Sequence, residues 1–175
     1  DTATGIATAL VSQDTERTFS TYLGAAVELT AEDIKEEWFD DCEYLYLEGY
    51  LVMNHDLMMD VLKKAKAKGM KTVIDLASYN VVEANIDFLN SIIKDYIDIV
   101  FANEEEAMTL TGKEPEEALD AIAEMTDIAI VKLGKVGSLI KTDGKSYRVE
   151  GKVADAVDTT GAGDLYAAGF LYGLI

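Results

Sequence analysis

The chain has 175 residues, of which 49% are hydrophobic, and a formal net charge of −18. This composition is that of a folded globular domain and excludes a disordered chain. The negative charge argues against nucleic acid and anionic membranes as partners, because both require a basic protein surface. Apolar runs are shorter than the roughly 20 residues of a membrane span. The single cysteine, Cys42, indicates a reducing compartment, so a cytoplasmic protein is expected.

The N-terminal part of the chain predicts a hairpin followed by a short helix. Residues 4–11 and 17–23 are rich in threonine and apolar side chains, and a polar turn separates them, which is typical of a β-hairpin. Thr30 and Asp33 have the spacing of a capping box. A short helix is therefore expected to begin there and to end near Phe39.

From residue 44 to residue 133 the pattern alternates between strand and helix. Strands are expected at 44–47, 71–76, 97–102 and 127–133. Helices are expected at 56–68, 82–95, 115–125 and from 104 to a stop at Gly112. This alternation predicts a parallel sheet covered by helices, with ligands at the carboxyl ends of the strands. A hairpin over 138–142 and 147–150, turned by Asp143 and Gly144, is expected to follow.

Residues 158–164, with the sequence DTTGAGD, lead into an apolar helix expected over roughly 164–175. The three residues 161–163 are small, so their backbone N–H groups are left uncovered beside the positive end of the helix. Such donors can hold a phosphoryl group, and Asp164 can take the proton of an attacking hydroxyl. From the residues alone, a glycine-rich turn that serves only packing is an equal alternative.

Two further stretches are expected at the same edge of the sheet. Asn103 and Glu106 offer an amide and a carboxylate, three positions apart, to a divalent cation that escorts ATP. Lys132, Gly134 and Gly137 belong to a strand end and loop that can hold the phosphates or ribose of a nucleotide. An ordinary helix start and an ordinary turn remain the alternatives. The chain has no P-loop and no complete dinucleotide-binding fingerprint.

Together these stretches resemble the motifs of the ribokinase-like carbohydrate kinases, the PfkB family, which includes adenosine kinase. DTTGAGD at 158–164 is similar to the C-terminal signature of that family. NEEE at 103–106 is similar to its N-x-x-E motif, and VKLGKVGS at 131–138 to its nucleotide-binding segment. The resemblance implies a three-layer αβα fold with a mostly parallel central sheet and β-hairpins at the edge. It also implies one domain over 1–175, with a hairpin over 1–24 near a lid or the sheet edge.

The activity implied by the resemblance is ATP-dependent transfer of the γ-phosphoryl group to a hydroxyl of a sugar or nucleoside. Asp164 is then the catalytic base, and the N–H groups of Gly161, Ala162 and Gly163 form the anion hole. A non-catalytic regulator that binds a nucleotide or sugar on the same scaffold is the alternative. A base such as Asp164 argues against it, because a protein that only binds does not need one.

The resemblance also implies how ATP and its cations are held. Asn103 and Glu106 organise Mg²⁺ and the phosphates, with Glu106 acting through water. Asp158 and Thr160 match positions that bind a monovalent cation, often K⁺, in many members of the family. The nucleotide loop is lined by Lys132, Gly134 and Gly137.

The chain departs from the family pattern at both ends. It starts at Asp1 without the Gly-Gly-x-x-x-Asn segment that holds the sugar, and it stops at Ile175 before the elements that close over adenine. We therefore expect a fragment that is inactive or unstable by itself. The acceptor is left open between sugars and nucleosides, with a lean toward adenosine-kinase-like members. A homodimer is left open as well.

Overall fold

The computed structural model describes residues 2–11, 17–155 and 159–175. Six strands form one sheet in the order β3-β4-β5-β6-β7-β8. Their bounds are β3 (Tyr44–Glu48), β4 (Lys71–Asp75), β5 (Ile99–Asn103), β6 (Ile128–Lys132), β7 (Gly137–Thr142) and β8 (Lys145–Glu150). Strands β3 to β6 run parallel, and β7 and β8 add an antiparallel hairpin at one edge. The mostly parallel sheet expected from the sequence is confirmed.

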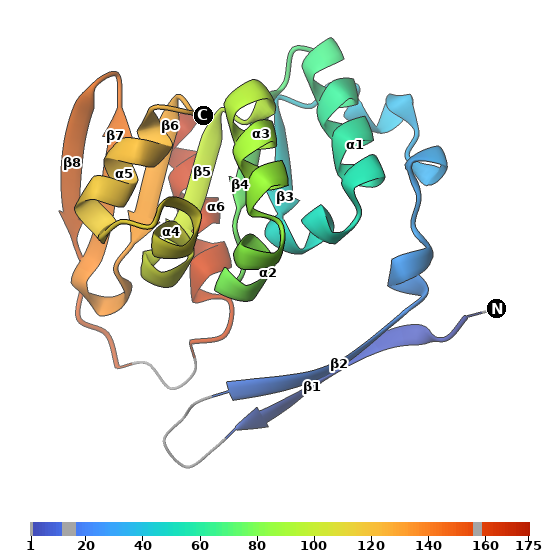
Figure 1. Cartoon of the computed structure of the whole chain (residues 1–175), viewed down its shortest axis with the longest axis horizontal. Coiled ribbons are helices and arrows are strands. Elements are labelled where there is room, and N and C mark those ends of the chain that lie inside the picture. The colour runs from blue at the N-terminus through green and yellow to red at the C-terminus, as the bar shows by residue number, and fades with distance from the viewer. Residues whose placement is uncertain (1, 12–16, 156–158) are drawn as a thin grey trace.

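Helices lie on both faces of this sheet (Figure 1). Their bounds are α1 (His55–Ala67), α2 (Tyr79–Ala84), α3 (Ile86–Tyr96), α4 (Glu104–Thr111), α5 (Pro115–Ala123) and α6 (Ala162–Leu174). Helices α1 to α5 share one hydrophobic cluster with the sheet, whereas α6 packs on the opposite face. This arrangement is the three-layer αβα fold. In the ranges that the structure describes, no helix is both long and apolar enough to cross a membrane.

Two helix predictions are wrong in detail. The single helix expected at 82–95 is divided into α2 and α3 at Asn85, whose side-chain amide donates to the Val81 carbonyl at 2.9 Å. This bond competes with the backbone ladder and favours a break there. The short helix expected after Thr30 is a pair of 3₁₀ turns, although the Asp33 carboxylate does accept from the Thr30 N–H at 2.9 Å.

Strands β1 (Thr4–Val11) and β2 (Arg17–Gly24) pair antiparallel as a separate two-stranded sheet. The hairpin extends away from the body of the molecule (Figure 1). Every residue of β1 is exposed, so both of its faces are in contact with solvent in this chain. A position near a lid in the whole protein stays a prediction.

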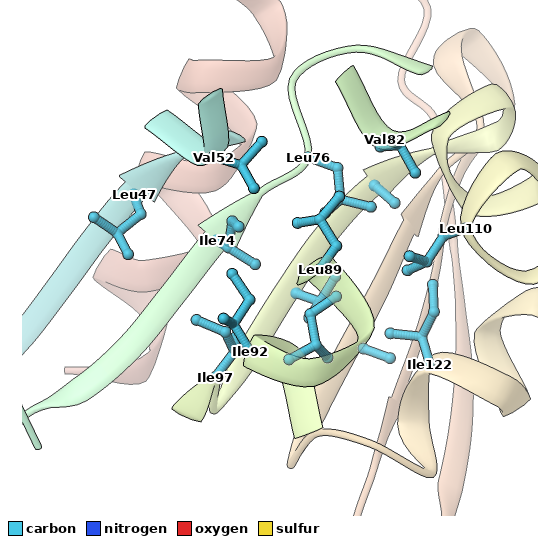
Figure 2. Packing of buried hydrophobic residues seen from close by; sticks show 14 of the residues in the cluster. Leu47, Val52, Ile74, Leu76, Val82, Leu89, Ile92, Ile97, Leu110 and Ile122 are labelled. Carbon is cyan, nitrogen blue, oxygen red and sulfur yellow. The ribbon is translucent and has the colours of Figure 1, made fainter. Parts of the chain in front are cut away.

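Alternation along the strands divides the core into two clusters. In β5, Val100 and Ala102 point toward α1 to α5, whereas Ile99 and Phe101 point toward α6. Figure 2 shows the larger cluster, where leucine and isoleucine side chains of the helices lie against Ile74 of β4. The central strands are therefore buried on both faces, as parallel strands usually are.

Phe101 attaches α6 to its face of the sheet. Its ring meets the rings of Tyr166 and Phe170 edge-on, with centroids 6.2 and 5.5 Å apart. Ala167 lies between these two helical positions and is also buried. The hydroxyl of Tyr166 donates to the Ser138 Oγ at 2.7 Å, which ties α6 to β7 as well. These contacts set where the first turn of α6 lies over the sheet.

Asp98 connects several elements by hydrogen bonds at the amino-terminal edge of the sheet. Its carboxylate accepts from Lys66 Nζ at 2.6 Å, from Lys71 Nζ at 3.0 Å and from the Thr72 N–H at 2.7 Å. Burial raises the pKa of this carboxyl group, but the hydrogen bonds outweigh burial and lower the pKa to about 2. Asp98 therefore links α1, the start of β4 and the start of β5.

Replacing Phe101 with Ala should lower the free energy of unfolding by about 3–5 kcal/mol, because it removes a fully buried ring and leaves a cavity under α6. Urea denaturation measures this loss. Phe19→Ala in β2 is the control, since that ring is 57% exposed, and it should cost less than about 1 kcal/mol. Equal effects of the two substitutions would contradict the assigned core.

Asp98→Asn should lower stability by about 1–2 kcal/mol at pH 7, after allowance for screening by solvent. A carboxyl group whose pKa is lower in the folded state stabilises the protein above its unfolded pKa of about 3.8, and that contribution fades as the pH falls through about 2. Urea denaturation between pH 7 and pH 2 should therefore show the gap between wild type and variant closing below pH 4. A gap that stays constant with pH would contradict this role.

Candidate active site

The last residues of the four parallel strands form a polar row at the carboxyl edge of the sheet. Glu48, Asp75, Asn103 and Lys132 end β3, β4, β5 and β6. The residues two positions earlier in these strands all belong to, or pack against, the cluster under α6: Tyr46, Val73, Phe101 and Ile130. Because strand residues two apart share a face, the row lies on the α6 side of the sheet.

Asp75 and Lys132 form an ion pair that spans the end of β5. Lys132 Nζ lies 2.6 Å from Asp75 Oδ2, and the two side chains are 17% and 8% exposed. The other carboxylate oxygen, Asp75 Oδ1, accepts from the Ala77 N–H at 3.3 Å. The aspartate is therefore held by its own turn on one side and by the lysine on the other.

Asn103 and Glu106 bond to each other at the start of α4. The Glu106 N–H donates to Asn103 Oδ1 at 2.9 Å, and the Asn103 N–H donates back to Glu106 Oε2 at 2.8 Å, which is a complete capping box. Asn103 Nδ2 donates to the remaining oxygen, Oε1, at 2.7 Å. Each oxygen of Glu106 thus accepts one hydrogen bond from Asn103, which holds the carboxylate in place at the start of α4. Each oxygen keeps a second lone pair that can hold a water.

Glu106 is only 2% exposed. Burial is the main cause that raises the pKa of its carboxyl group. The Asn103 hydrogen bond and the charge of Lys132 act in the opposite direction, and the charge of Asp75 adds to the rise. Glu106 is therefore within the electrostatic reach of the ion pair, although its own hydrogen bonds are with Asn103.

The glycine turn opens α6 above this row. Gly161 has a φ of 75° and a ψ of 8°, the left-handed conformation that glycine adopts at least cost. The Ala162 N–H donates to the Thr159 carbonyl at 3.1 Å, and the Leu165 N–H starts the helical ladder at Gly161. Of the three expected donors, Ala162 is thus already engaged. The N–H groups of Gly163 and the next residue precede the ladder and belong to the positive end of the helix.

Distances place this turn beside the polar row. Lys132 Nζ is 3.5 Å from the point that a Cβ on Gly163 would occupy. Asp164 Oδ2 is 3.6 Å from the corresponding point on Gly161, so this carboxylate folds back over the turn. The side chain of Asp164 is exposed at the mouth of the site. The turn thereby brings together a candidate base, Asp164, with the Lys132 ammonium and the N–H donors of the helix.

Glu48 and Tyr46 of β3 lie within the electrostatic reach of Asp164. Partial desolvation of the Glu48 carboxyl group raises its pKa most, although the residue as a whole is exposed, and the charges of Asp75 and Asp164 raise the pKa further. The pKa of Tyr46 is also raised, by burial first and then by Asp75, Glu48 and Asp164. The Tyr46 hydroxyl is buried, and within the described part of the chain it has no hydrogen-bond partner.

The predicted nucleotide loop follows Lys132 directly. Gly134 has a φ of 52° and begins a 3₁₀ turn that ends at Val136. Gly137 has a φ of 121°, and a Cβ there would lie 1.9 Å from the Val149 carbonyl oxygen. The close approach of β8 therefore explains this glycine without a ligand. A Cβ at Gly134 would meet no atom of the described residues within 4 Å, so that side of the loop is accessible among them.

The expected monovalent-cation site is only partly described. Asp158 lies outside the described residues, and Thr160 is an exposed residue just before Gly161. The site stays a prediction. Over the described ranges, no three His, Cys, Asp or Glu side chains converge in a way that could hold a metal ion.

Three residues of the site were missed in the sequence: Tyr46, Glu48 and Asp75. Asp75 and Glu48 carried a usable signal, because each is an acidic residue at the carboxyl end of an apolar parallel strand. Gly49 follows Glu48 for a packing reason, since a Cβ there would lie 2.4 Å from the Leu76 carbonyl oxygen. For Tyr46, the sequence offers no comparable signal.

Residues 1–175 match the family model described as pfkB family carbohydrate kinase. The chain belongs to this family. Guanosine-inosine kinase from Escherichia coli (strain K12) is 29% identical to it over 135 residues. Ribokinase from Haemophilus influenzae is 32% identical over 118 residues. The structure of adenosine kinase from Sinorhizobium meliloti matches with a TM-score of 0.90 at 36% identity, and the ribokinase-like fold is thereby confirmed.

These relatives are longer than the chain. The aligned part covers 73% of the chain and 31% of the guanosine-inosine kinase, and 63% of the chain and 36% of the ribokinase. The adenosine kinase match covers 97% of the chain and 54% of that structure. The chain thus spans from about a third to about half of the relatives.

Asn103→Ala should lower the free energy of unfolding by about 1–3 kcal/mol, because it removes the cap of α4 and one donor to a buried carboxylate. Ser78→Ala is the matched control, since Ser78 occupies the N-cap of α2 without a capping hydrogen bond. That control should change stability by less than about 0.5 kcal/mol. Chemical denaturation of both variants checks the difference, and equal losses would refute the capping role.

Proposed function

We propose that the whole protein is an ATP-dependent kinase that transfers the γ-phosphoryl group to a hydroxyl of a sugar or nucleoside. The observation that carries the proposal is the meeting of Asp164, the N-terminal turn of α6 and Lys132 at the carboxyl edge of the sheet. Membership of the pfkB carbohydrate kinase family supports it. A base, a cation and helix N–H donors are the groups that phosphoryl transfer needs.

In the proposed reaction, the oxygen of the acceptor hydroxyl attacks the γ-phosphorus, and a new O–P bond forms. The bond between the γ-phosphorus and the β–γ bridging oxygen breaks, and ADP leaves with that electron pair. The hydroxyl proton passes to the Asp164 carboxylate. The turn of residues 161–163 and the Lys132 ammonium stabilise the charge on the transferred group. Here the Gly163 N–H is the donor that precedes the helical ladder.

ATP is itself an anion, and the chain has a net charge of −18. Local donors and an accompanying cation must therefore overcome the long-range repulsion. Mg²⁺ supplies charge neutralisation on the phosphates when it is bound. Glu106 and Asn103 would hold it through a water, because Glu106 is buried and each of its oxygens keeps a lone pair beside the hydrogen bond from Asn103. Hard oxygen donors and retained waters suit this ion. A K⁺ site at Asp158 and Thr160 belongs to the same proposal.

Relatives named for guanosine and inosine, ribose and adenosine indicate an acceptor that carries a sugar ring. Glu48 is exposed beside Asp164, and a carboxylate there can accept hydrogen bonds from acceptor hydroxyls. Contacts to the nucleotide are expected instead from the accessible side of the loop at Gly134.

A homodimer and a cytoplasmic location stay predictions.

Asp164→Asn should lower kcat at least about 10²-fold, because the acceptor hydroxyl loses its proton acceptor. Binding of Mg-ATP should be kept, since the backbone of the turn is unchanged. The measurement is ADP release by the whole protein with adenosine, guanosine and ribose as acceptors. Asp143→Asn is the control, because it makes the same chemical change in the β7–β8 turn, where Asn also tolerates the φ of 50°.

Full turnover by Asp164→Asn would refute its role as the base. A wild-type protein that binds Mg-ATP but phosphorylates none of the acceptors would favour the non-catalytic regulator.

A further inference from the structure

Lys132 contacts two features at the carboxyl edge of the sheet, the Asp75 carboxylate and the first turn of α6. Its ammonium is 2.6 Å from Asp75 Oδ2 and lies against Gly163 in the first turn of α6. An ammonium group has three donors, and the ion pair uses one of them. In the described part of the chain this ammonium has no second acceptor, so its other donors can bond an oxygen of an anion seated on the turn. Lysine acts at such a site as a compact point charge.

Asp75 holds this ammonium from a fixed position. It is buried, it ends β4, and its second oxygen accepts from the Ala77 N–H. Ala77 has a φ of 64°, an uncommon value for a residue with a Cβ. The aspartate thus shapes the turn after β4 and also faces the lysine two strands away.

We propose that Asp75 is a positioning residue for phosphoryl transfer, which holds the Lys132 ammonium against the Gly163 turn so that the ammonium binds the transferred phosphoryl group. The inference rests on the proposed kinase function and adds to it a role for a residue outside the sequence motifs. Lys132 then contacts the reacting group itself, while Asp75 acts through Lys132.

A purely structural ion pair is the competing explanation, and the molecule contains one for comparison. Lys66 and Asp98 also lie 2.6 Å apart between Nζ and Oδ2, but at the amino edge of the same sheet. That pair bonds to the starts of strands and lies far from the turn of α6. A loss of stability is therefore all that Asp98→Asn should produce.

Asp75→Asn is the central variant, because an amide oxygen can still accept from the Ala77 N–H while the negative charge is removed. Measured on the whole protein with Mg-ATP and the acceptor that supports turnover, kcat should fall about 10²-fold, since a misplaced group costs that much. The KM for ATP should not rise, because a negative charge near the phosphates is gone. The same assay on Asp98→Asn should return the wild-type kcat.

Two further variants distinguish a role of Asp75 in positioning Lys132 from a role in stability alone. They are Lys132→Met and the double variant Asp75→Asn/Lys132→Met. Lys132→Met should lower kcat about 10²–10³-fold, raise the KM for ATP and lower Tm, because it leaves Asp75 buried and unpaired. The double variant should recover Tm, since neither charge is left alone. Its kcat should stay as low as that of Lys132→Met.

Recovery of both Tm and kcat in the double variant would show that the pair is only structural and would overturn the inference. A wild-type kcat in Asp75→Asn would do the same. If the wild-type protein phosphorylates none of the tested acceptors, the kinase proposal fails and the inference fails with it, whereas an active wild type beside an unaffected Asp75→Asn variant overturns the inference alone.

Discussion

Parallel strands that are paired side by side end at the same edge of a sheet, and the residues that end them become neighbours. In this chain, Glu48 pairs in register with Asp75, and Asn103 pairs with Lys132. Asp75 pairs with Phe101, so β5 and β6 extend two residues further than β3 and β4, and the four positions, far apart in sequence, form one stepped polar row. The first turn of α6 is placed over that row by its contacts with Phe101 and β7. The candidate site depends on this pairing more than on any single loop.

The charged side chains at the two edges of the sheet are compensated to different degrees. At the amino edge, Asp98 is surrounded by two lysines and a backbone donor, so its charge is well compensated. At the carboxyl edge, Lys132 acts on both Glu48 and Glu106 while it is paired with Asp75. The pKa values of both glutamates are raised, by burial in Glu106 and by partial desolvation in the more exposed Glu48. Ionisable groups whose pKa values are shifted in this way are typical of binding and catalytic sites.

Some residues of the sequence motifs are explained by the fold itself, without a bound ligand. Gly137 is required by the approach of β8, and the Asn103–Glu106 pair completes a capping box. A capping role and a role in binding are compatible, because the cap fixes the carboxylate that a water can join. Gly163 differs from these residues, since among the described residues a Cβ there would meet only the Lys132 ammonium at contact distance.

Local patterns in the sequence determined the order and type of the strands, the parallel sheet, most helices and the DTTGAGD turn, because strand periodicity, caps and glycines act over a few residues. The tertiary structure decided the break at Asn85, the engagement of the Ala162 N–H and the partner of Lys132. Asp75 is 57 residues away from that lysine, and only the strand order β4-β5-β6 brings them together. Sequence separation carries no record of such a pairing, because the register and twist of the folded sheet create it.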